Sequence, residues 1–112
     1  MRRVIVVTGR AEVPAGNRES FLAVATEMCR SSRADAGCLG YRVHADLEQP
    51  DQYVFVEEWA DEDSLQKHFA QPHTAAFMAG LRGLLSGNAD VLFHTVASSR
   101  RLDPQRGLID VS

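Results

Sequence analysis

The sequence predicts an α+β fold in which two helices cover one face of a four-stranded antiparallel sheet. Four short segments are rich in Val, Ile, Tyr and Phe, the residues that suit a pleated surface. Two longer segments place apolar residues at helical spacing. Along the chain these segments follow the order β-α-β-β-α-β, which is the ferredoxin-like arrangement.

The first strand and the first helix occupy the N-terminal third. Arg3–Val13 is rich in Val and Ile on both of its alternating faces, which is typical of a sheet covered on both sides. Pro14–Asn17 breaks this strand. Apolar residues then form one helical stripe over Asn17–Arg33, and Gly37 is suited to the left-handed turn that ends a helix.

A β-hairpin is predicted in the middle of the chain. The second strand runs over Cys38–Ala45, and the third contains the β-branched and aromatic run Tyr53–Val56. The residues between them, Glu48–Asp51, are typical of turns. We therefore expect two antiparallel strands joined by a fairly long loop.

The second helix is predicted to be interrupted. It begins at the acidic run Asp61–Asp63, whose carboxylates suit the first turn of a helix. Apolar residues follow at helical spacing, with His68 at one edge of the stripe and His73 at the other. Pro72 lies between them and should kink the helix or restart it. Trp59 stands just before this helix, at the end of the third strand.

The remaining sequence predicts one domain and a tail. Val91–Ala97 is expected to be the fourth strand, so that the domain spans residues 1–98. Residues 99–112 are polar and are expected to be a loose tail, although Leu108–Val111 could pair with another strand. Two helices cannot cover both apolar faces of the sheet. We therefore expect a homodimer in which a second subunit covers the other face.

Composition excludes several classes of partner. The chain has 112 residues and a formal net charge of −3, so no basic footprint for nucleic acid is present. Its apolar runs are too short to span a membrane. The two cysteines, Cys29 and Cys38, form no C-x-x-C motif and are expected to be free thiols of a cytoplasmic protein.

Five sequence features together resemble a known family. They are Gly37–Tyr41 after the first helix, Glu58-Trp59 at the end of the third strand, the helix start Asp61–Leu65, His68, and Gln71–His73. This combination is similar to the antibiotic biosynthesis monooxygenase superfamily, and above all to its small quinol-monooxygenase-like bacterial members. The resemblance covers most of the predicted domain and is specific for the family, whereas it is not specific for one reaction.

The resemblance implies a dimeric α+β barrel with an apolar pocket between helices and sheet in each subunit. Members of the family include cofactor-free oxygenases of quinols and polycyclic phenols, haem-degrading enzymes, and an isomerase of a phosphorylated signalling sugar. In the oxygenases, an electron-rich phenol loses a proton and passes an electron to oxygen, and the two radicals recombine. The function implied is a monooxygenase without any cofactor, which takes a small aromatic substrate and molecular oxygen.

The chain offers candidate residues for that chemistry. His68 is the candidate base, because a polar ring beside an apolar stripe costs free energy unless something pairs with it. Trp59 and His73 are the other two candidate catalytic residues. His73 is expected mainly to support the interruption at Pro72, and Trp59 to stand beside the site. Apolar and aromatic side chains are expected to line the pocket: Tyr41, Phe55, Leu65, Phe69, Phe77 and Met78. Phe69 and Phe77, which are at helical spacing, also suit a plain core.

Other readings remain open. An isomerase would use His68 and His73 to shuttle a proton, and would need Arg42 or Arg82 to hold a phosphate. A binding module without catalysis would turn both histidines to solvent. No metal site is expected, because two histidines five residues apart lie ~140° apart around a straight helix. Glu57 is expected only to pair across strands with Arg42.

Overall fold

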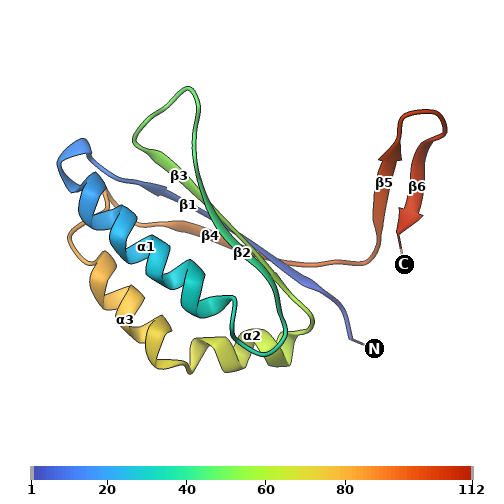
Figure 1. Ribbon diagram of the computed structural model, residues 1–112, viewed down its shortest axis with the longest axis horizontal. Coiled ribbons are helices and arrows are strands. Elements are labelled where there is room, and N and C mark those ends of the chain that lie inside the picture. The colour runs from blue at the N-terminus through green and yellow to red at the C-terminus, as the bar shows by residue number, and fades with distance from the viewer. Residues whose placement is uncertain (1, 112) are drawn as a thin grey trace.

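The computed structural model describes residues 2–111 and has the predicted order of elements (Figure 1). Four strands form one antiparallel sheet in the spatial order β2-β3-β1-β4. The predicted α+β, ferredoxin-like fold is therefore confirmed. The strands are β1 (Ile5–Glu12), β2 (Cys38–Ala45), β3 (Gln52–Trp59) and β4 (Asp90–Thr95).

The helices pack on one face of this sheet (Figure 1). Alternate residues of β1 and β3 point toward the helices and are buried, including Val7, Phe55 and Trp59. Phe21 of α1 packs on this layer and is fully buried. The helical elements are the 3-10 turn η1 (Ala15–Asn17), α1 (Arg18–Ser32), α2 (Glu62–Phe69) and α3 (Pro72–Leu81).

The predicted interruption at Pro72 is a full restart of the helix. Gln71 is extended, with φ −73° and ψ 143°, and Pro72 occupies the first turn of α3. A proline is tolerated there because its missing N–H would have had no helical partner. The second predicted helix is thus two helices, α2 and α3, and the chain changes direction between His68 and His73.

The turn after α1 is held tightly against the start of α2. Gly37 has φ +80°, a left-handed conformation that favours glycine. Its carbonyl accepts a hydrogen bond from the Ala60 N–H at 2.8 Å. A Cβ atom at position 37 would overlap the side chain of Ser64. This close approach fixes the turn that carries Asp35 beside α2.

The opposite face of the sheet is also apolar but only partly buried. Val6, Val54 and Val56 are half-buried there, and Leu92 is 54% exposed. All helices of residues 2–111 lie on the other side of the sheet. Such a face suits a protein interface, and the homodimer stays a prediction.

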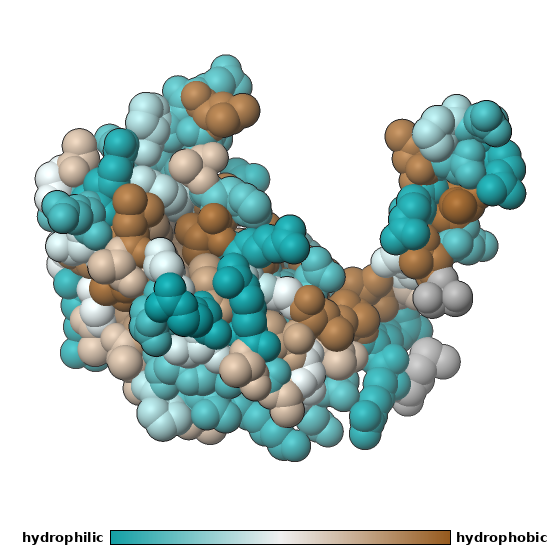
Figure 2. Space-filling view, viewed as in Figure 1, coloured by the Kyte–Doolittle hydropathy of each residue, from teal (hydrophilic) through white to brown (hydrophobic). Residues whose placement is uncertain are grey.

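Residues 99–111 differ from the loose tail that was expected. They form an antiparallel hairpin of β5 (Ser99–Asp103) and β6 (Gly107–Val111), so the alternative in which Leu108–Val111 pairs is correct. The Asp103 side chain accepts hydrogen bonds from the N–H groups of Gln105 and Arg106 and shapes the turn. The hairpin stands apart from the sheet (Figure 1), and Figure 2 shows apolar surface on it.

Along the described part of the chain, residues 2–111, no helix combines the length and apolarity that a membrane crossing requires.

Candidate functional site

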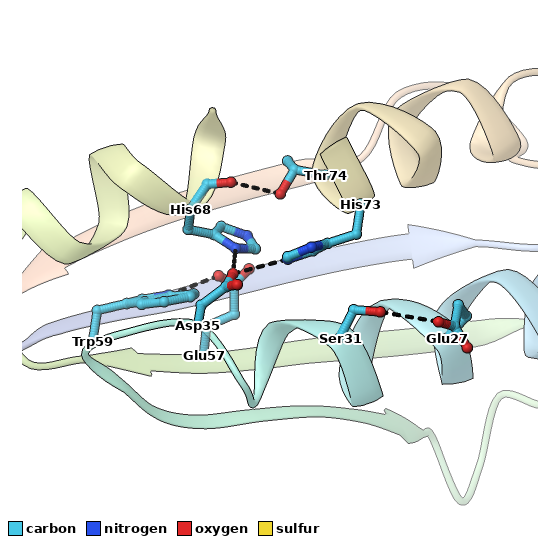
Figure 3. Close-up of polar contacts among 8 residues, drawn as sticks. All are labelled: Glu27, Ser31, Asp35, Glu57, Trp59, His68, His73 and Thr74. Carbon is cyan, nitrogen blue, oxygen red and sulfur yellow. Dashed lines mark hydrogen bonds and ion pairs between the residues drawn. The ribbon is translucent and has the colours of Figure 1, made fainter. Parts of the chain in front are cut away.

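One carboxylate and two imidazoles meet where three elements come together (Figure 3). Oδ2 of Asp35 lies 2.9 Å from Nδ1 of His68 and 2.9 Å from Nε2 of His73. Asp35 belongs to the turn after α1, His68 to the last turn of α2, and His73 to the first turn of α3. The restart of the helix at Pro72 allows both rings to reach the same oxygen.

This arrangement assigns the protons of the two rings. An ionised carboxylate only accepts hydrogen bonds, so each imidazole donates one to Asp35. His68 then carries its proton on Nδ1, which leaves the lone pair on Nε2. Nε2 of His68 has no hydrogen-bond partner among residues 2–111, and this atom is not fully buried. Nδ1 of His73 keeps a lone pair in the same way, but His73 does not line the cavity described below, whereas His68 does. Nε2 of His68 is therefore the atom of this cluster that can receive a proton from a ligand in that cavity.

The ring of His68 is held on several sides. The side chain is only 2% exposed. The indole of Trp59 lies against it, with ring centroids 4.5 Å apart, and Tyr41 lies at 5.9 Å. The hydroxyl of Thr74 donates a hydrogen bond to the His68 carbonyl oxygen. Packing and hydrogen bonds thus fix the direction of Nε2 without help from a ligand.

A second carboxyl group belongs to the same cluster. Nε1–H of Trp59 donates a hydrogen bond of 2.9 Å to Oε1 of Glu57. Burial raises the pKa of the Glu57 carboxyl, and the bond from Trp59 partly opposes this. Burial and the nearby Glu57 charge also raise the pKa of Tyr41, so its phenol stays protonated and is a poor base at neutral pH. Trp59 itself is completely buried.

His68 and Glu57 line an apolar cavity of about 450 Å³ between the helices and the sheet. This volume is in the range that holds a small organic ligand. Five of the six predicted lining residues are on its wall: Tyr41, Phe55, Phe69, Phe77 and Met78. Leu65 is not, because it is buried in the core. Trp59 and His73 are not on its wall; both lie beside His68, which is.

A hollow of about 520 Å³ lies between α1 and β2, apart from the cavity of His68. Arg42 and His44 line this hollow. The expected pair between Arg42 and Glu57 is absent from residues 2–111, because Arg42 lies opposite Val56 and thus points to the other face of the sheet from Glu57. Arg82 lines neither cavity.

Two members of the cluster, Asp35 and Glu57, were not predicted. In the sequence Asp35 is recognisable only as part of the stop of a helix, and its partners lie 33 and 38 residues further on. Glu57 sits at a position of β3 that faces the helices, between Phe55 and Trp59. A charged residue at an inward position of a strand is the signal that could have singled it out.

The cluster could also hold a metal ion. The ligand atoms of Asp35, His68 and His73 lie within 4.8 Å of one another, and imidazole and carboxylate are ligands of zinc and related metals. The expectation that the histidine spacing disfavours a metal pair assumed one straight helix. That assumption was wrong, because α2 and α3 are separate helices.

The comparison with known proteins decides the family. The family model for antibiotic biosynthesis monooxygenase matches residues 4–80. The chain belongs to this family. A Bacillus subtilis relative named "Putative monooxygenase YcnE" is 30% identical over 89 residues, which cover 80% of this chain and 94% of the relative. A Synechocystis protein is 28% identical over 98 residues, 88% of this chain and 67% of that protein.

Solved structures agree with the fold of this family. A conserved protein from Methanosarcina mazei Go1 superposes with a TM-score of 0.80 at 23% identity, over 84% of this chain and 93% of that chain. PA3566 from Pseudomonas aeruginosa gives a TM-score of 0.78 at 24% identity, over 88% and 98% of the two chains. At these identities the likeness establishes the fold alone.

Proposed function

We propose that this member of the antibiotic biosynthesis monooxygenase family is a cofactor-independent monooxygenase that oxidises a quinol or polycyclic phenol with molecular oxygen. The observation that carries the proposal is the Asp35–His68 pair at the wall of an apolar cavity. An oriented imidazole with a free nitrogen supplies the base, and the apolar wall supplies a dry space for an aromatic ring.

The reaction begins with a proton transfer. The phenolic hydroxyl of the substrate gives its proton to Nε2 of His68, and the imidazolium that forms is stabilised by the carboxylate of Asp35. The phenolate then passes one electron to oxygen, which gives a phenoxyl radical and superoxide. The two radicals combine to form a carbon–oxygen bond, and the peroxide anion that results takes the proton back from the imidazolium of His68. Loss of water from this hydroperoxide gives the oxidised product and leaves His68 neutral again.

The alternatives have less support. An isomerase of a phosphorylated sugar would need a cation in the cavity, and neither Arg42 nor Arg82 lines it. A non-catalytic binding module was expected to turn its histidines to solvent. His68 is instead only 3% exposed and is paired with Asp35.

We also propose that the protein acts as a homodimer. The half-buried apolar face of the sheet, with Val6, Val54 and Val56, supports this assembly. A two-fold dimer buries the same face of both subunits. A cytoplasmic location, expected from the free thiols Cys29 and Cys38, stays a prediction.

The test is oxygen uptake by metal-stripped protein with a panel of hydroquinones and anthrones. We expect at least one compound to be consumed in step with oxygen, at a rate that depends on His68. Absence of oxygen uptake over the whole panel, with folded protein, would overturn the proposal.

A further inference from the structure

Glu57 is a carboxyl group in an apolar setting. It projects from β3 toward the helices, and its neighbours across the sheet are Val7 on β1 and Tyr41 on β2. Along β3 it lies between the inward-facing Phe55 and Trp59. A carboxyl group in such a place costs free energy unless its oxygens have partners.

Only one oxygen of this carboxyl has a partner. Oε1 accepts the hydrogen bond from Trp59, whereas Oε2 has no hydrogen bond and no ion pair within residues 2–111. Oε2 is not fully buried, and Glu57 lines the cavity. The free oxygen thus has access to a ligand in the cavity.

Trp59 links this carboxyl to the candidate base. Its indole stacks against His68 on one side and holds Glu57 through Nε1 (Figure 3). Three polar side-chain atoms of the residues on the cavity wall have no hydrogen-bond partner within residues 2–111: Nε2 of His68, Oε2 of Glu57 and the hydroxyl of Tyr41. The buried side chain of Trp59 positions the first two. Most of the remaining wall is apolar.

We propose that Glu57 is a second anchoring group, which binds one oxygen substituent of an aromatic ligand while Nε2 of His68 binds another. The inference rests on the proposed function, because it takes the ligand of this cavity to be aromatic. The class of substrate is then an arene with two oxygen substituents, such as a quinol, and not a phenol with one. Glu57 acts in this scheme as a positioning and specificity residue.

The chemistry of the carboxyl suits this role. When ionised it accepts a hydrogen bond from a hydroxyl, and when protonated it can also donate one to a carbonyl. The same residue can therefore hold the reduced form of a quinol and its oxidised form. Its raised pKa is consistent with a setting in which both states are accessible.

Binding without turnover separates this inference from catalysis. Calorimetric titrations under argon would compare 1,4-dihydroxynaphthalene with 1-naphthol, which lacks the second hydroxyl. We expect the wild type to bind the diol about tenfold more tightly, the effect of one additional hydrogen bond to a charged or buried group. Glu57→Leu should weaken binding of the diol to the level of 1-naphthol and leave 1-naphthol almost unchanged.

Two further variants serve as a conservative substitution and as a control. Glu57→Gln has nearly the same shape and can still accept the bond from Trp59, so it covers the case in which the leucine variant does not fold. We expect its preference for the diol to fall between those of the other two proteins. Glu48→Gln is the matched control, because Glu48 is exposed and lies in the loop between β2 and β3, away from the cavity and from the proposed dimer face; it should bind like the wild type.

The outcomes distinguish the two proposals. Equal preference for the diol in the wild type and in both Glu57 variants would overturn the role of Glu57, as would failure of the wild type to bind either compound. Loss of the preference in the variants, together with no oxygen uptake on any substrate, would preserve the binding role and remove the monooxygenase. Oxygen uptake that depends on His68 but not on Glu57 would preserve the monooxygenase and remove the binding role of Glu57.

Discussion

Nδ1 of His68 lies 2.9 Å from Oδ2 of Asp35, although 33 residues separate them in the chain. The contact joins the end of α2 to the turn after α1. It converts an imidazole at the edge of an apolar stripe into an oriented base whose free nitrogen is accessible from the cavity.

Removal of the base should nearly abolish turnover. We expect His68→Ala to lower the rate of oxygen uptake by about 10²- to 10⁴-fold, the usual effect of losing a general base. His44→Ala is the matched control, because His44 is exposed on β2 and lines the other hollow. A His68→Ala protein as active as the control would end the candidacy of His68.

Loss of the charge on Asp35 should act through His68. Asp35→Asn should lower turnover by about a hundredfold, since a carboxylate that fixes the tautomer of a base can contribute up to about 10⁴-fold. The same substitution in a His68→Ala background should add almost nothing, because the two residues act as a unit. Independent, multiplicative losses in the double variant would contradict the pair. His73→Ala should cost less than either single change.

The ionisation of Glu57 should contribute to the pH dependence of the free energy of unfolding. Its folded pKa is raised above the unfolded value, so the folded protein binds more protons in the range between the two. Stability should therefore decrease as pH rises through that range, from the ordinary glutamate pKa upward. Glu57→Gln should remove this part of the pH dependence and raise Tm at neutral pH. Thermal melts of both proteins across pH would check it, and an unchanged slope in the variant would count against it.

Metal ions should not be needed and zinc should inhibit. We expect chelator-treated protein to keep its oxygen uptake, because the proposed chemistry uses only the imidazole and the substrate. Added Zn²⁺ should slow the reaction, since binding to Asp35, His68 and His73 would take Nδ1 of His68 and break its bond to Asp35. Glu48→Gln should be inhibited like the wild type, because Glu48 is an exposed loop residue, whereas His73→Ala should need more zinc. Loss of activity on chelation, restored by a metal, would refute cofactor independence.

Assembly can be tested on the uncovered face of the sheet. Light scattering at micromolar concentration should report about twice 12.3 kDa. Val56→Asp should shift the protein toward monomer, because a charge would enter the apolar face. Leu47→Asp changes a fully exposed loop residue and should leave the mass unchanged. A wild-type protein that stays monomeric would refute the dimer.

Local patterns were sufficient for most of the fold. The strand Cys38–Ala45 was predicted with the bounds that it has, because Gly37 marks its start and its residues alternate. The restart at Pro72 follows from the chemistry of proline alone. The hairpin at 99–111 was harder to predict, since Leu102 and Leu108 are exposed and leave no pattern of burial.

The site was only partly predictable. His68 is recognisable in the sequence because a polar ring stands beside an apolar stripe. Its partner Asp35 could not be found in this way, because their contact depends on how α1 and α2 pack and not on spacing in the chain. Glu57 was assigned to the wrong partner, because the register between β2 and β3 decides that Arg42 lies opposite Val56.

The sulfur atoms of this protein differ in their exposure to the proposed chemistry. Burial raises the pKa of both Cys29 and Cys38, so these thiols stay protonated and react slowly with peroxide. Met78 lies on the wall of the cavity and is 57% exposed. Peroxide that escapes from the reaction would therefore oxidise Met78 before either cysteine. The sulfoxide would place a polar group on an apolar wall. Oxidation would therefore impair substrate binding before it damaged the core.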